Sequence, residues 1–143
     1  QQAISAPPGF EEGMFEAGEP VFFNESQGKL PVRFVTESSW TVLYRTEDSG
    51  ASWTPSTPVE VSGSYDIASI QDAWVWDGER IAVSRDGGAT WATALTNINL
   101  AGWLMQIDFV DQYVGWATAA SADGSYQLYQ SLDSGVTWTQ LQP

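Results

Sequence analysis

Short segments in which apolar and polar residues alternate recur along the chain, separated by turn-forming residues. A spacing near two, with many β-branched and aromatic residues, is typical of half-buried strands. No long stretch follows a helical period, so the pattern predicts an all-β protein. The segments come in pairs: TVLYRT at 41–46 with ASWTPS at 51–56, RIAVSR at 80–85 with ATWATA at 89–94, and QLYQSL at 127–132 with VTWTQL at 136–141.

The turn inside each pair repeats the same pattern, Ser/Thr-x-Asp-x-Gly-x-Ser/Thr-Trp. It occurs as TEDSGASW at 46–53, SRDGGATW at 84–91 and SLDSGVTW at 131–138. Five fixed positions that recur three times indicate an internal structural repeat of roughly 40 residues. We call these three segments the box turns.

The residue types of the box turns account for a tight turn between two strands. The Asp carboxylate accepts backbone N–H groups across the turn, and the Gly supplies a positive φ. The Trp ring folds back and covers the turn with apolar area. The structural residues predicted in this way are Asp48, Gly50, Trp53, Asp86, Gly88, Trp91, Asp133, Gly135 and Trp138.

A second motif, Phe-x-Asp/Asn-x-x-x-Gly, precedes two of the box turns. Phe22, Asn24 and Gly28 match it in the first repeat, and FVDQYVG at 109–115 matches it in the third; the second repeat, SIQDAWVW at 69–76, has no glycine at the matching place. Each repeat therefore predicts four short antiparallel strands, the size of a propeller blade. The predicted blades span about 19–58, 64–97 and 102–143, after an irregular lead-in over residues 1–18. The alternative for GMFEAG at 13–18 is a strand fragment that completes some other blade.

The triplicated turn resembles the Asp-box, or BNR, repeat of sialidases, some plant-cell-wall glycosidases and sortilin-type receptors. The pairing of IDFVDQYVGWAT with LYQSLDSGVTW is most similar to the photosystem II assembly and stability factor family. The resemblance covers about residues 20–143 and implies a β-propeller. It implies no single activity, because proteins with different functions share the repeat.

Composition and charge exclude several classes of function. The chain has 143 residues, no cysteine, no histidine and a net charge of −13. Such a chain repels nucleic acid and anionic lipid, and it contains no apolar run near the roughly 18 residues of a membrane helix. The start QQAISAPPGF is interpreted as that of a mature or excised segment. Because similar repeats occur in secreted or surface-attached proteins, the protein is expected to be extracellular, periplasmic or at the cell surface.

Catalysis, metals and cofactors are not expected. Each box Asp is interpreted as capping its own turn, because a Ca²⁺ site needs several converging oxygens. The resemblance to sialidases implies an arginine cluster, which five cationic residues do not supply convincingly. A glycosidase built on paired carboxylates stays the rival hypothesis. Its candidates are Asp72, Asp77, Glu79, Asp108 and Asp111.

Exposed aromatic residues are the predicted ligand-binding positions. Trp76, Trp103 and Tyr126 are the candidates, because aromatic platforms stack on sugars and anchor protein interfaces. The alternative is that Trp74 and Trp76 pack between neighbouring blades. The predicted function is a non-catalytic module that binds or scaffolds a protein or glycan; a glycoside hydrolase fragment and a photosystem assembly factor are the alternatives.

Three repeats are fewer than the roughly four to eight blades of a closed propeller. The chain is therefore expected to be a partial propeller from a longer protein, or half of a six-bladed homodimer.

Overall fold

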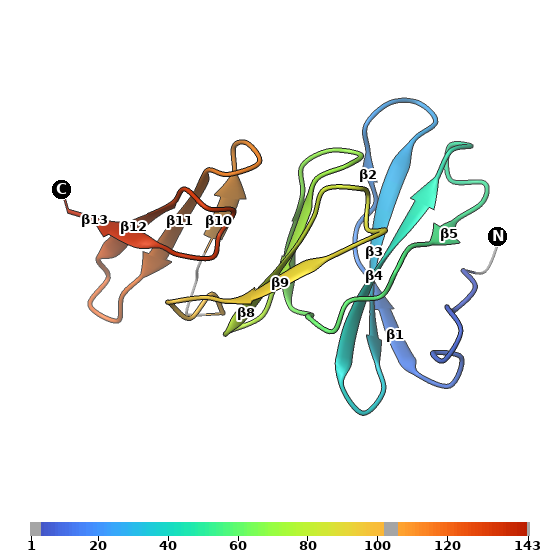
Figure 1. Cartoon of the computed structure of the whole chain (residues 1–143), viewed down its shortest axis with the longest axis horizontal. Coiled ribbons are helices and arrows are strands. Elements are labelled where there is room, and N and C mark those ends of the chain that lie inside the picture. Colours follow the sequence, from blue (N-terminus) through green and yellow to red (C-terminus); the bar gives the residue numbers. More distant parts are fainter. Residues whose placement is uncertain (1–3, 102–105, 143) are drawn as a thin grey trace.

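The computed structural model describes residues 4–101 and 106–142, which form thirteen strands in three antiparallel sheets and no helix (Figure 1). Within that described part, no helix is available that could cross a membrane. The predicted fold class is confirmed: the protein is all-β, with sheets of the propeller-blade type.

The first sheet contains five strands in the order β1-β3-β4-β5, and β2 also pairs with β3. The predicted irregular lead-in is wrong in part, because Met14–Ala17 pairs with Val32–Val35 of β3. All four residues of this strand are exposed, so no alternating pattern marks it in the sequence. The strands are β1 (Met14–Ala17), β2 (Val21–Phe22), β3 (Gly28–Val35), β4 (Ser39–Thr46) and β5 (Thr54–Pro55).

The second and third sheets are four-stranded meanders, in which every strand pairs with the next one along the chain. This order follows from the short turns, which join only neighbouring antiparallel strands. The second sheet consists of β6 (Ser64–Ile67), β7 (Ala73–Trp76), β8 (Arg80–Ser84) and β9 (Ala92–Leu95); the third consists of β10 (Gln106–Phe109), β11 (Gly115–Ala120), β12 (Tyr126–Ser131) and β13 (Thr139–Leu141).

The three sheets stack face to face, and alternating side chains of the middle sheet serve both neighbours (Figure 1). Val75 and Ala82 pack with Val59 and Val61, which follow β5. The intervening positions of the same strands carry Trp74, Trp76 and Ile81, which pack against the third sheet. A strand buried on both faces loses the polar alternation of an exposed strand, as AWVW at 73–76 does.

The N-terminal segment covers the outer face of the first sheet. Ile4, Ala6 and Phe10 pack against a cluster that includes Phe34 and Tyr44. The Tyr44 hydroxyl donates a 2.6 Å hydrogen bond to the Ser5 carbonyl, which fastens the segment to β4. The side of the first sheet that faces away from the second sheet is therefore covered in part by the chain's own residues, although Phe15, beside Phe34, is 66% exposed.

Candidate functional site

The three box turns share one hydrogen-bond arrangement. In the first, the Thr46 hydroxyl donates to Asp48 over 2.9 Å and accepts the Gly50 N–H over 2.8 Å. The Asp48 carboxylate also accepts the Ser52 N–H and hydroxyl, over 2.8 and 2.6 Å. The same four contacts recur around Asp86 and Asp133.

Through these contacts, each box carboxylate stabilises its own turn. Hydrogen bonds from Thr90 and Ser84 lower the pKa of Asp86 to about 2. Hydrogen bonds from Ser52 and Thr46 likewise lower the pKa of Asp48. Within residues 4–101 and 106–142, no three acidic side chains gather in a way that would hold a metal ion.

Each of the three box tryptophans packs into a hydrophobic cluster beside its own sheet. Trp138 joins the cluster between the second and third sheets, and Trp91 packs with residues between the first and second. Trp53 packs on the outer face of the first sheet, beside the N-terminal segment. Gly50, Gly88 and Gly135 have φ values of 88°, 96° and 89°, as the turn requires.

The upstream motif also has a common geometry, and it includes the second repeat. Phe22 pairs with Gly28 and Phe109 pairs with Gly115, each Phe ring lying where a glycine side chain would be. The second repeat has Ile67 paired with Ala73 at these positions. The sequence pattern did not reveal this match, because the second repeat has Ile67 in place of the Phe and Ala73 in place of the Gly.

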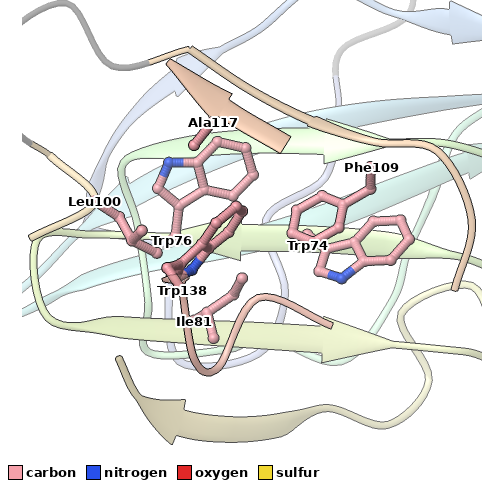
Figure 2. Packing of buried hydrophobic residues seen from close by; sticks show 7 residues of the cluster. All are labelled: Trp74, Trp76, Ile81, Leu100, Phe109, Ala117 and Trp138. Atoms are coloured by element: carbon pink, nitrogen blue, oxygen red, sulfur yellow. The ribbon is translucent and has the colours of Figure 1, made fainter. Parts of the chain in front are cut away.

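The ligand-binding predictions have different outcomes. Trp76 is wrong as an exposed platform: its side chain is 5% exposed and packs edge-on to Phe109 between the second and third sheets. The alternative of packing between blades therefore holds for Trp74 and Trp76 (Figure 2). Tyr126 is 78% exposed at the start of β12. Trp103 lies outside the described residues.

Several candidate acids of the glycosidase hypothesis have structural partners. Asp77 lies 3.1 Å from Arg80, and Asp72 lies 3.3 Å from Arg85. Asp111 accepts backbone N–H groups from Tyr113 and Val114, each over 2.7 Å. Each of these contacts lies within a single repeat.

Residues on the outer face of the third sheet are more exposed than residues at equivalent positions of the first two sheets. Leu43, Ile81 and Leu128 each lie three residues before the first Ser or Thr of a box turn. Leu43 and Ile81 are 0% exposed because each faces the next sheet, whereas Leu128 is 40% exposed. Trp116 corresponds in the same way to the buried Trp74, since each follows the small residue that pairs with the box Ser. We call Trp116, Tyr126, Leu128 and Leu132 the third-sheet outer face.

A groove of about 660 Å³ lies between the first and second sheets, beside the second box turn. Its lining includes Lys29 and Arg45 from the first sheet and Asp86 from the second. The Lys29 side chain is 3% exposed, and its ammonium donates a 2.7 Å hydrogen bond to the Gly87 carbonyl. Burial, and then the nearby Arg45, lower the pKa of Lys29, while Asp86 acts in the opposite direction. Sequence analysis did not single out this lysine.

Comparison with known proteins adds little to this geometry. No family model matches the chain, and no curated protein matches it significantly. One solved structure to which it is similar is described as "YCF48 bound to D1 peptide"; the two are 12% identical, the match covers 88% of this chain and 83% of that one, and the TM-score is 0.34. We draw no functional conclusion from a similarity at that level.

Proposed function

We propose that this chain is a non-catalytic module that binds a protein partner through the third-sheet outer face. The observation that supports the proposal is the difference in exposure between equivalent residues: Ile81 is 0% exposed, whereas Leu128 is 40% exposed. A position that is apolar in every repeat but covered only in the first two sheets is suited to receive a further protein layer. Large exposed apolar patches on soluble proteins commonly mark such interaction sites.

The side chains on this face suit a protein interface. Leu132 and Tyr126 are 66% and 78% exposed. Aromatic anchors such as Tyr126 carry much of the binding energy at protein interfaces. The opposite end of the stack is already covered in part by the N-terminal segment, with Phe10 packed on Phe34 and Trp40. The proposed partner therefore docks at one end of the stack.

The test compares Leu128→Glu/Leu132→Glu with the parent chain in quantitative co-purification from the source cells. Leu95→Glu is the matched control, because Leu95 is 72% exposed on β9 of the second sheet. We expect the parent and control chains to retain the same partner, and the double variant to lose it while its circular dichroism spectrum is unchanged. Equal recovery of every co-purifying protein by all three chains would refute the proposal. Fractionation of those cells tests the further proposal that the module lies outside the cytoplasm.

A further inference from the structure

Two cationic side chains lie directly opposite each other on neighbouring strands. Lys29 of β3 is the register partner of Arg45 of β4, and Arg45 is in turn opposite Thr54 of β5. Side chains of directly opposed residues point to the same face of a sheet, and like charges in that arrangement destabilise it. Only five lysine and arginine residues occur in this acidic chain, so placing two of them together is notable.

The buried ammonium of Lys29 has unused capacity for hydrogen bonding. It carries three donors, and within the described chain it makes one hydrogen bond, to Gly87. No carboxylate of the described residues lies within 4.0 Å of it. Buried charges in proteins are ordinarily paired.

The rest of the groove complements an anion that also carries hydroxyl groups. The hydroxyl of Ser56 is buried there without a hydrogen-bond partner in the structure. Thr54, Thr57 and Gln71 add further polar groups to the lining. The volume lies within the roughly 300–1,000 Å³ of small-molecule sites.

The net charge of the lining favours a ligand with one negative charge over a ligand with two. Lys29 and Arg45 carry two positive charges, and Asp86 carries one negative charge on the opposite wall. Glu47 lies 3.9 Å from Arg45, but both side chains are exposed, 55% for Arg45 and 62% for Glu47, so water screens that pair. A monocarboxylate balances the net positive charge that remains, whereas a phosphate dianion leaves an excess negative charge beside Asp86.

We propose that the groove between the first and second sheets binds a small hydroxylated monocarboxylate, whose carboxylate lies between Lys29 and Arg45. This site is distinct from the third-sheet outer face, and the inference does not depend on the proposed protein partner. The ligand's hydroxyl groups interact with the exposed polar side chains of the lining, Thr54, Thr57 and Gln71.

The experiment measures binding of sodium gluconate to the whole chain by titration calorimetry at low ionic strength. Glucitol is the matched neutral probe, and inorganic phosphate is the anion probe without the carboxylate. Arg45→Gln is the decisive variant. Because the Arg45 side chain is largely exposed, this substitution should leave the fold and the Lys29–Gly87 contact in place. Arg33→Gln is the control, since Arg33 is an exposed cation on β3, the strand that also carries Lys29, and does not line this groove. Lys29→Met tests the buried charge itself.

We expect gluconate to bind the parent and Arg33→Gln chains equally, and glucitol not to bind. Arg45→Gln should weaken gluconate binding about tenfold, as loss of a charge-assisted contact does. Lys29→Met should remove binding, and circular dichroism checks that it is folded. Equal affinity of the parent and Arg45→Gln chains, binding of glucitol, or binding of phosphate but not gluconate would each overturn the proposal.

Discussion

Trp74 of β7 lies flat on Phe109 of β10, with ring centroids 4.2 Å apart and planes 2° from parallel (Figure 2). The two rings belong to different sheets, so their contact is part of what joins the second and third blades. Trp76 and Trp138 meet the same Phe109 ring edge-on, at 6.3 and 6.1 Å. One phenylalanine therefore connects three tryptophans.

Phe109→Leu should lower the free energy of unfolding by about 1–2 kcal/mol, because the substitution removes aromatic contacts and leaves part of the ring volume empty. Urea unfolding followed by tryptophan fluorescence measures this change. Val110→Ala is the control, since Val110 is 59% exposed at the next position. Equal unfolding free energies for the two variants would show that the stack contributes little.

Alanine substitutions at two glycines should distinguish the cost of backbone strain from the cost of overpacking. Gly135 and Gly124 have φ values of 89° and 83°. A Cβ on Gly135 would lie 2.6 Å from the Ile81 side chain, whereas nothing lies within 4 Å of one on Gly124. Both substitutions to alanine should cost about 1–2 kcal/mol for the left-handed conformation. Gly135→Ala should cost about 1–3 kcal/mol more, because it overpacks the contact between the sheets.

Thermal and urea unfolding of the two alanine variants checks this difference. If Gly135→Ala and Gly124→Ala unfold at the same urea concentration, the close approach of Ile81 to the turn is not a packing constraint. If Gly124→Ala is as stable as the parent chain, the strain argument fails at that turn.

The box turns were predictable from sequence because their contacts are local. The Thr46 hydroxyl and the Asp48 carboxylate bond groups at most four residues away, so the pattern of residue types contains the geometry. The strand at 14–17 was predictable only as a possible fragment of some other blade, because its partner is distant and its residues are all exposed. The Lys29–Gly87 contact spans 58 positions, so no local pattern reveals the buried charge. Alternation placed Trp76 on a face of its strand but did not show that another sheet covers that face.

Stability in acid should depend on Asp86. Because hydrogen bonds lower its pKa in the folded protein from 3.8 to about 2, the unfolded chain binds a proton more readily in that interval. The stabilisation is therefore complete above pH 3.8 and is lost as the pH falls through about 2. Asp86→Asn should be less stable than the parent at pH 6, and the difference should shrink as the pH falls.

Urea unfolding at intervals between pH 6 and pH 2 measures this dependence. Glu60→Gln controls for the change in net charge, because it removes one exposed carboxylate. A gap between Asp86→Asn and the parent that stays constant across the acid range would contradict the assignment. A pH profile of Glu60→Gln that matched Asp86→Asn would attribute the effect to net charge.

A Phe–Gly pair, as in the first and third repeats, should be able to replace the Ile67–Ala73 pair of the second repeat when both residues are changed together. A Cβ on Gly115 would lie 2.7 Å from the Phe109 ring, and one on Gly28 would lie 2.8 Å from the Phe22 ring. The second repeat instead pairs Ile67 with Ala73. Ile67→Phe alone should cost about 1–3 kcal/mol, because the ring meets the Ala73 methyl group in a packed core.

Ala73→Gly alone should cost about 1 kcal/mol, because glycine weakens a strand and leaves a gap. The double variant restores the Phe–Gly pair of the other repeats, so its cost should be less than the sum by about 0.5–3 kcal/mol. Urea unfolding of the parent, both single variants and the double variant completes the cycle. If the two costs simply add, Ile67 and Ala73 do not occupy the same positions as Phe109 and Gly115, and the second repeat forms its upstream turn by different packing.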